Sequence, residues 1–177
     1  ARCWMASNLN YGDHVLSNQG QADNCVVEKY CLNDQQQRCD NSGGFYQWGE
    51  LMRYQHDFST QGICPPGWHV PSESEWQMLL TGVTPGISPP VDGIAGGFLK
   101  DTNMVSGFHA ILSGMNYLGF LWAHENSTTD VFGSFYWTST TYNDTHSWSR
   151  GLLSRNPSVS KYPGSKGNAF NVRCVRD

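Results

Sequence analysis

The sequence predicts one α+β domain, with two helices, several short strands and long loops. Three observations lead to this fold class. Two segments carry apolar residues at helical spacing, and a serine and a glutamate mark the start of one of them. Several short segments rich in β-branched and aromatic residues predict strands. The segments between them are rich in Gly, Pro, Asn and Ser, which is typical of turns and loops.

Length and composition indicate a single exported globular domain, residues 1–177. The chain has 177 residues, enough to bury a hydrophobic core, and its net charge of -4 argues against a nucleic-acid-binding protein. Aromatic residues reach 13 %, as expected of a domain whose loops are pinned by rings. No run approaches the roughly 20 apolar residues of a membrane span. No signal peptide begins the chain, so we expect a mature or trimmed form of a secreted or surface-exposed protein.

Cysteine usage supports the same location. An even number of cysteines in an acidic, polar chain predicts three disulfides formed in an oxidising compartment. Their pairing cannot be chosen from the sequence alone, although Cys31 and Cys39 are close enough for a local bridge. A zinc site is not expected, because the chain has no CxxC motif and no histidines at zinc-site spacing.

The first third of the chain is expected to contain one helix and much irregular structure. Residues 13–42 are polar and predict a long loop held by its cysteines. Residues 45–55, FYQWGELMRYQ, predict an amphipathic helix in which Trp48 and Met52 are core residues. Residues 1–12 alternate well enough for a strand whose inward side chains would be Cys3, Met5 and Leu9.

The stretch GICPPGWHVPSESEWQMLL carries the most consistent local signals. Residues 65–67 predict a turn and residues 68–70 a short extended segment. Ser72 and Glu75 predict a capping box, in which each side chain satisfies a free backbone N–H at the start of a helix. That helix is expected to end at Gly82 and to bury Trp76, Leu79 and Leu80.

One alternative for this stretch is chemical. His69 with Glu73 and Glu75 has the residue types of a metal or acid–base cluster. A capped helix behind a turn accounts for all three residues without a further role, so we favour the capped helix.

The middle of the chain is predicted to be loops and strands. Residues 82–97 hold many glycines and prolines and predict a connecting loop, followed at 98–100 by a helix end or a short strand. Residues 107–122 predict a pair of strands, and residues 123–134 a polar segment that contains the sequon Asn126-Ser127-Thr128. Two more strands are expected at 135–141 and 169–175.

Between those two strands, residues 142–168 show neither helical nor strand periodicity, and we call them the C-terminal run. Ser, Gly, Asn and Tyr are frequent in it, as in antibody paratopes, so we expect a loop surface that binds a ligand. Asp144 is its one acidic residue, so the run is expected to be locally positive and to favour an acidic partner. The cations are Arg150, Arg155, Lys161 and Lys166.

Several blocks along the chain resemble a known family. They are CWMASNLNYG, GGFYQW, GICPPGWHVPSESEW, GFHAILSGMNYLG, YWTSTTYN and FNVRCVRD, in this order. They resemble the Fibrobacter succinogenes major paralogous domain family of bacterial surface and secreted proteins. That family is similar to the C-type lectin-like fold of formylglycine-generating enzymes and of the variable proteins of diversity-generating retroelements. The resemblance implies a C-type lectin-like fold whose ligand surface is built by C-terminal loops and strands.

The resemblance to variable proteins also implies which residues bind the ligand. The C-terminal run holds residue types that mutated asparagine codons can encode, interrupted by framework positions. The implied framework is Trp137, Trp148, Leu152, Lys166 and Phe170. The implied variable residues are Tyr142, Asn143, Asp144, Thr145, His146, Ser149, Gly151, Leu153, Arg155, Asn156, Ser158, Ser160, Tyr162, Pro163, Gly164, Ser165, Gly167 and Asn168.

The function implied is a receptor-binding or adhesive module on a pilus tip, a surface lipoprotein or a phage tail fibre. Its partner would be a protein or glycan receptor, with no nucleic acid and no membrane insertion. Tyr142, His146, Arg155 and Tyr162 are the expected hot spots, because aromatic and Arg side chains dominate such interfaces. No catalytic residue and no cofactor is expected. This type of fold can hold a structural calcium, but no DxDxDG-type loop supports one.

Two alternatives to this function remain open. A formylglycine-generating-like oxidase would need a closely placed cysteine pair, which this chain lacks near its C-terminal end. Cys174 lies between Arg173 and Arg176, which would favour a thiolate, but a disulfide explains it more simply. The other alternative is a fixed structural surface or pilus subunit. Positions like those of the family pair Cys64 with Cys174 and Cys31 with Cys39, and leave Cys3 to pair with Cys25.

Overall fold

The structure is a computed structural model that describes residues 2–55, 61–101, 106–117, 120–122 and 133–177. It is an α+β fold, as predicted. Its helices are η1 (Leu32–Asp34), α1 (Gln36–Ser42), α2 (Trp48–Leu51), α3 (Glu73–Gly82) and α4 (Asp92–Lys100). Its strands are β1 (Asp13–His14), β2 (Glu28–Lys29), β3 (Tyr46–Gln47), β4 (Trp68–His69), β5 (Met115–Tyr117), β6 (Phe120–Trp122), β7 (Gly133–Thr141), β8 (His146–Leu153), β9 (Val159–Ser165), β10 (Ala169–Phe170) and β11 (Val175–Arg176).

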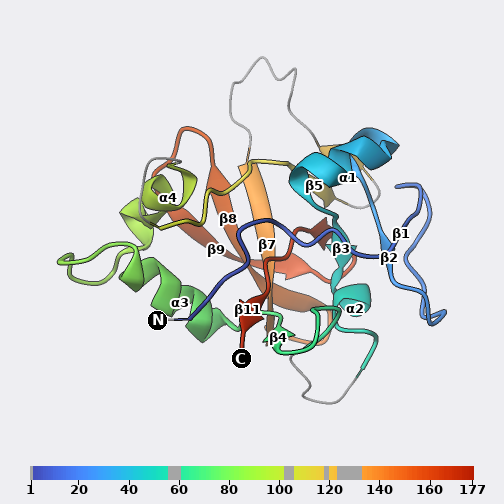
Figure 1. The fold of residues 1–177 in the computed structure, drawn as a ribbon, viewed down its shortest axis with the longest axis horizontal. Coiled ribbons are helices and arrows are strands. Elements are labelled where there is room, and N and C mark those ends of the chain that lie inside the picture. The colour runs from blue at the N-terminus through green and yellow to red at the C-terminus, as the bar shows by residue number, and fades with distance from the viewer. Residues whose placement is uncertain (1, 56–60, 102–105, 118–119, 123–132) are drawn as a thin grey trace.

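An antiparallel sheet of order β7-β8-β9 forms the centre of the molecule. Figure 1 shows α3 and α4 on one side of it and α1, α2 and β3 on the other. Because alternate residues of a strand point to opposite faces, Tyr136 and Leu152 face the helices while Phe135 and Trp137 face the other way. Both faces of the sheet are therefore buried, each in its own apolar cluster.

The cluster under the helices is built from aromatic rings. Trp4, Trp76, Phe108 and Tyr136 contact one another with ring centroids 5.1–5.9 Å apart, mostly in edge-to-face geometry. The cluster on the opposite face joins Trp137 and Phe170, whose centroids lie 4.3 Å apart, to Leu51, Val70 and the Cys64–Cys174 disulfide. These two clusters fix the sheet between them.

The end of the chain runs through the core, where β10 and β11 pair with strands from earlier parts of the sequence. Strand β10 lies between β3 and β5, and β11 pairs with β4. Asn171 is fully buried; its Oδ1 accepts from Ser113 and Ser134, and its Nδ2 donates to the Gly44 carbonyl at 2.9 Å. Arg173 is fully buried as well and donates to Asn8 Oδ1 and the Phe108 carbonyl. The FNVRCVRD block is therefore structural.

Helix α3 confirms the strongest local prediction. Ser72 Oγ accepts from the Glu75 N–H at 3.3 Å, and the Glu75 carboxylate accepts from the Ser72 N–H at 2.9 Å, which completes the capping box. Trp76 and Leu80 are fully buried, Leu79 packs against the same cluster, and the helix ends at Gly82.

Four predicted elements are corrected. Residues 92–97, predicted as loop, and 98–100, predicted as a helix end or short strand, together form α4, because Ala95 and Leu99 bury one side of it against the sheet. The helix expected at 45–55 shrinks to α2, because Tyr46 and Gln47 pair with β10. In the stretch 107–122 the predicted strand pair is present as β5 and β6, but residues 107–113 are not part of it. Residues 1–12 form no named strand, although Met5 and Leu9 donate to the carbonyls of Cys174 and Val172.

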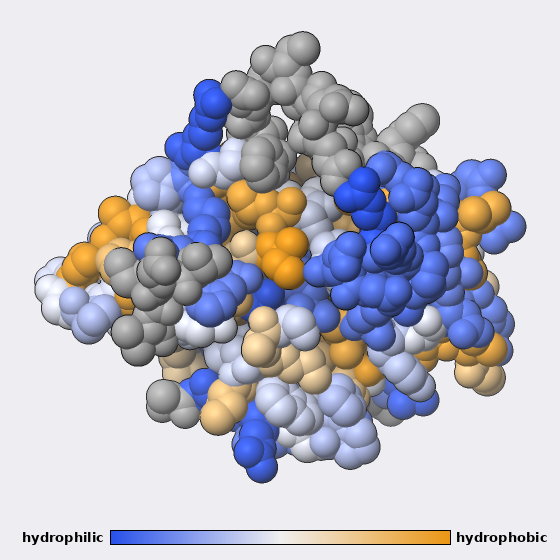
Figure 2. Space-filling model, turned by 45° about the horizontal axis from the view of Figure 1, so that its top comes forward, coloured by the Kyte–Doolittle hydropathy of each residue, from blue (hydrophilic) through white to orange (hydrophobic). Residues whose placement is uncertain are grey.

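The polar segment 13–42 is more ordered than predicted. It contains β1, β2, η1 and α1, and Figure 2 shows hydrophilic side chains gathered over this side of the molecule. The sequon at 126–128 lies outside the described residues. No helix of the described chain has the length and apolar character needed to cross a membrane.

Two of the three predicted disulfides are present, Cys31–Cys39 and Cys64–Cys174. The third pair is wrong, because Cys3 and Cys25 are both free and exposed. Cys3 lies beside β11, where its carbonyl accepts from the Arg176 N–H, whereas Cys25 precedes β2. Figure 1 shows these two regions on opposite sides of the molecule, so the thiols are too far apart to pair.

Candidate functional site

The C-terminal run is mostly strand, which corrects the prediction of a loop surface. Strands β8 and β9 pair through seven registered residues, from His146 with Ser165 to Leu152 with Val159. Periodicity failed to show this because β8 is buried on both faces and therefore does not alternate.

The ladder separates the implied ligand residues into two groups. The turn at 142–145 and the turn at 166–168 lie at one end of the sheet, and the turn at 154–158 lies at the other. Strand β8 has 8 residues, so the two ends are about 24 Å apart. Arg155, Asn156 and Ser158 therefore cannot share one compact site with Tyr142 and His146.

Burial removes further residues from the implied set. Ser149, Gly151, Gly164 and Asn168 are buried in the sheet or beneath it. The implied framework residues Trp137, Leu152 and Phe170 are also buried. Intermediate exposure is found at His146, Leu153, Ser158, Pro163 and Ser165. The exposed members are Tyr142, Asn143, Asp144, Thr145, Arg155, Asn156, Ser160, Tyr162 and Gly167.

We call residues Tyr142–His146 together with Lys166 and Gly167 the turn surface. The Asn143 side chain holds it in shape, since its Oδ1 accepts from the N–H groups of Thr145 at 3.0 Å and His146 at 2.8 Å. The Lys166 N–H donates to the Thr145 carbonyl at 2.9 Å and joins the two turns. The turn surface is thus exposed but internally bonded.

Aromatic side chains support the turn surface from below. Tyr142 is 54 % exposed and meets the Trp148 ring edge-on, with centroids 4.8 Å apart. The Lys161 ammonium lies 4.2 Å from the Trp148 ring centroid. Trp48 Nε1 donates to the Thr138 carbonyl at 3.0 Å, and Thr138 Oγ1 donates to the Trp148 carbonyl at 2.9 Å. These contacts tie the turn surface to α2 and β7.

A cleft of about 660 Å³ opens between the turn surface and α2. Its walls include Gln47, Met52 and the two aromatic rings of Trp48 and Tyr54. Gln21 and Gln47 are locked together, since each side-chain carbonyl accepts from the other residue's N–H, at 2.7 and 3.2 Å. The remaining walls come from Asp23, Gly49, Gln55, Asp144, Lys166 and Gly167. The size suits a small ligand or one side chain of a partner.

Sequence reasoning missed this cleft because half of it comes from other parts of the chain. Trp48 and Met52 were predicted to be core residues; Met52 is buried, but both also line the cleft. No local pattern connects Gln21 and Asp23 with a turn more than a hundred residues later, so only the folded chain brings them together.

A larger groove of about 1440 Å³ follows α3. Its polar end is lined by Thr140 and Lys161, and its apolar part by Trp4, Met78 and Leu79. Met78 is 56 % exposed there, although it belongs to a helix whose other side is buried. None of the turn-surface residues lines this groove.

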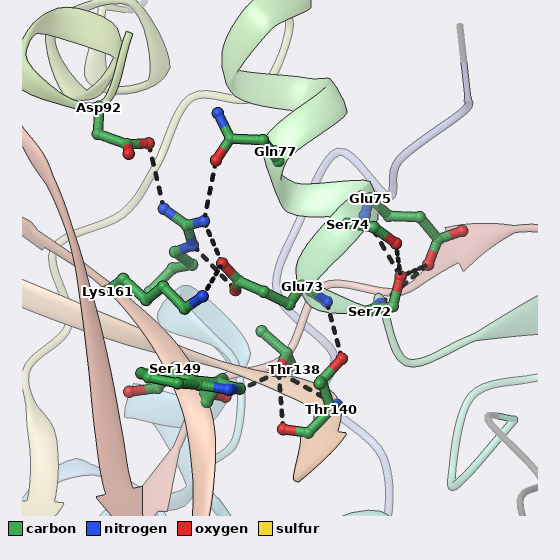
Figure 3. A network of polar contacts seen from close by, with 12 residues as sticks. Ser72, Glu73, Ser74, Glu75, Gln77, Asp92, Thr138, Thr140, Ser149 and Lys161 are labelled. Atoms are coloured by element: carbon green, nitrogen blue, oxygen red, sulfur yellow. Dashed lines mark hydrogen bonds and ion pairs between the residues drawn. The ribbon is translucent and has the colours of Figure 1, made fainter. Parts of the chain in front are cut away.

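Electrostatics differ from the positive patch that was expected. Arg150 is 1 % exposed and donates to Glu73, to Asp92 Oδ1 at 3.2 Å and to Gln77 Oε1 at 3.2 Å. Figure 3 shows these three side chains and Lys161 gathered around one guanidinium, and Lys161 Nζ lies 3.2 Å from Glu73 Oε1. The Arg150 charge is therefore neutralised inside the fold, and Lys161, although 41 % exposed, is paired with Glu73.

In the alternative metal or acid–base cluster, Glu73 lies apart from His69 and Glu75. His69 Nε2 lies 2.9 Å from Glu75 Oε1 and its Nδ1 lies 2.5 Å from Asp177 Oδ1, whereas Glu73 points away to Arg150. Among the described residues no group of three or more His, Cys, Asp or Glu is placed to hold a metal ion.

A family model described as the Fibrobacter succinogenes major domain matches residues 1–176. The chain belongs to this family. No curated protein and no solved structure matches it.

The blocks that carry the family resemblance are mainly structural. Five residues of these blocks lie in the core of this Fibrobacter succinogenes major domain: Asn8, Trp76, Trp137, Asn171 and Arg173. The turn surface overlaps the YWTSTTYN block at Tyr142 and Asn143, which are both exposed. These buried residues form the frame that carries the turn surface.

Proposed function

We propose that this domain is a ligand-binding module, a receptor-binding or adhesive domain that presents the turn surface to its partner. The fold we assign is C-type lectin-like, in the variant of formylglycine-generating enzymes. One observation carries the proposal: exposed Tyr142, Asp144 and Thr145 stand on a turn whose backbone is fixed by Asn143 and Lys166. Exposed side chains on a preorganised backbone lose little entropy on binding.

We further propose that the exposed positions of the C-terminal run are diversified by a retroelement. Side chains that point into solvent can change without loss of core packing, which a diversified surface requires. An extracellular site, on a pilus, a lipoprotein or a phage tail fibre, agrees with the two disulfides. A reverse-transcriptase gene and a near-identical template beside the locus would support diversification, and a locus with neither would contradict it.

The two alternative functions, an oxidase and a fixed structural subunit, have less support. Cys174 is bonded to Cys64 and is therefore no free thiol for an oxidase of the formylglycine-generating type. A fixed structural subunit would assemble through a surface held constant. Apart from Asn143, whose side chain fixes the turn, the exposed side chains of the turn surface are not needed for its shape.

The test uses arrays of glycans and of surface proteins probed with the labelled domain. We expect a binder whose signal falls at least about tenfold in a Tyr142→Ala, Thr145→Ala double variant, because aromatic truncation at a hot spot typically has that effect. Arg155→Ala at the other end of the sheet is the matched control and should bind like the wild type. Equal losses in both variants, or no array member bound at all, would contradict the proposal.

A further inference from the structure

The cleft beside α2 has an acidic wall. Asp23 and Asp144 line it, and Glu28 and Glu50 lie just behind. The Glu28 carboxylate is engaged, since it accepts from the Ala22 N–H at 2.8 Å and from Asn24 Nδ2 at 2.9 Å. Four carboxylates thus lie around one cleft whose only cationic lining residue in the described chain is Lys166.

Glu50 is the most unusual of these acids. It is 3 % exposed, and its Oε1 accepts from the Glu28 N–H at 2.9 Å. Its other carboxylate oxygen and the hydroxyl of Tyr54, a lining residue, are both buried, and a hydrogen bond between the two side chains lowers the pKa of Glu50 and raises that of Tyr54.

The titration behaviour agrees with a negative potential in the cleft. Burial raises the pKa of Glu50 more than its hydrogen bonds from the Glu28 N–H and the Tyr54 side chain lower it, and the charges of Glu28 and Asp23 add to the rise. Burial also raises the pKa of Tyr54, and Glu50, Glu28 and Asp23 add to this effect. The part of both shifts that comes from the charges of Glu28 and Asp23 reflects a negative potential, which favours a cation.

The protein already places one cation in this position. The Lys166 ammonium lies 4.4 Å from the centroid of the Trp48 ring and donates to the Asp144 carbonyl at 3.1 Å. An aromatic face next to carboxylates is the usual environment for binding an ammonium or a guanidinium. Lys166 shows that the geometry at Trp48 suits a cation.

We propose that the cleft beside α2 binds a lysine or arginine side chain of a protein partner. The inference rests on the proposed ligand-binding function and names the chemistry of its site. The aliphatic part of such a side chain would pack on Met52 and Trp48, and its charged end would reach Asp23 and Asp144. This reverses the acidic partner that the composition of the C-terminal run predicts, because the cations of that run are neutralised or lie elsewhere.

The test measures binding of short peptides by calorimetry at low salt. The probes are a tetralysine peptide, a tetraarginine peptide, a tetraglutamate peptide and glucosamine, which carries an ammonium group on a sugar. We expect the two basic peptides to bind and the acidic one not to bind. Their affinity should fall steeply as salt rises, because screening weakens exposed charge pairs. Asp23→Asn and Asp144→Asn should each weaken binding about three- to tenfold.

Two further variants control for unspecific attraction. Asp40→Asn makes the same charge change on the exposed side of α1, where Asp40 accepts from Asn10 and Gln36, and should leave binding unchanged. Lys166→Met removes the resident cation and should tighten binding of the basic peptides; with an acidic ligand it would weaken binding instead. An equal effect of Asp40→Asn, a weaker complex with Lys166→Met, or preference for the acidic peptide would overturn the proposal.

The outcomes separate the two proposals. If an array partner depends on Tyr142 while the basic peptides fail to bind, the cation site is wrong and the ligand-binding function stands. If glucosamine binds as tightly as tetralysine, the group recognised is an ammonium on a sugar and the protein partner is overturned. If basic peptides bind with the expected response to Asp23→Asn while no array member depends on Tyr142, the cation site stands and the proposed contact through Tyr142 is wrong.

Discussion

At the scale of single residues, two buried guanidinium groups are stabilised in different ways. Arg150 has the carboxylates of Glu73 and Asp92 beside it. Arg173 is surrounded by neutral groups, with Asn8 Oδ1 and the Phe108 carbonyl as acceptors and the Phe108 ring 4.0 Å from its guanidinium carbon. Burial lowers the pKa of Arg173 accordingly. The first arrangement joins α3 and α4 to the sheet, and the second joins the end of the chain to its start.

Two buried glutamates should give opposite pH dependence of stability. For Glu75, burial raises the pKa, but hydrogen bonds from Ser72 and His69 outweigh it, so the folded pKa lies below the usual 4.5. Its stabilising effect is therefore complete above about pH 4.5 and is lost as the pH falls through the folded pKa. For Glu50 the folded pKa lies above 4.5, so its ionisation costs stability as the pH rises through that value.

We expect Glu75→Gln to destabilise the protein at neutral pH, with the difference from the wild type shrinking on acidification. Glu50→Gln should be neutral or stabilising at neutral pH, with the gain disappearing in acid. Urea unfolding from about pH 3 to about pH 7 measures both free energies. Parallel pH profiles for the two variants would contradict the opposite shifts.

At the scale of elements, a helix could be predicted from the sequence only where the residues that favour it lie close together in the chain. Helix α3 was predicted correctly because its turn, its capping box and its apolar side all lie within one stretch. Helix α4, with sequence DGIAGGFLK, carries three glycines that favour loops, and its helical state depends on contacts with β9 and the turn before it. Tertiary packing overrode local propensity there.

The glycines of α4 provide a test. A Cβ at Gly96 would lie 2.6 Å from the Ser158 carbonyl oxygen and 2.8 Å from that of Pro157, whereas one at Gly93 would meet nothing within 4 Å. Gly96→Ala should therefore lower the free energy of unfolding by about 1–3 kcal/mol. Gly93→Ala should raise it by about 0.5–1 kcal/mol, because alanine favours the helix. Thermal and urea unfolding check both; a stabilising Gly96→Ala would show that α4 does not pack closely on this turn.

At the scale of the whole molecule, the frame was more predictable than the site. The family blocks, two disulfides and the strand at 135–141 follow from residue pattern or resemblance. The site depends on which distant segments of the chain come into contact, and neither periodicity nor composition predicts those contacts. The charge of the C-terminal run illustrates this: four cations in sequence become one buried guanidinium, one paired lysine, one lysine over Trp48 and Arg155 at the far end.

The two disulfides should contribute unequally to this frame. Cys64–Cys174 spans 110 residues of sequence and Cys31–Cys39 only 8, while all four sulfur-bearing side chains are buried. Because a longer closed loop removes more entropy from the unfolded chain, Cys64→Ala with Cys174→Ala should cost about 5 kcal/mol, and Cys31→Ala with Cys39→Ala about 2–3 kcal/mol. Urea unfolding of both double variants measures the difference.

Cys3→Ser is the control for the loss of a thiol without the loss of a bridge. Cys3 is exposed and unbonded, so the substitution should change the free energy of unfolding by less than about 0.5 kcal/mol. Alkylation of the native protein should label Cys3 and Cys25 and leave the other four cysteines unlabelled. A destabilised Cys3→Ser variant, or a peptide map that links Cys3 to Cys25, would mean that the start of the chain is held to β2 after all.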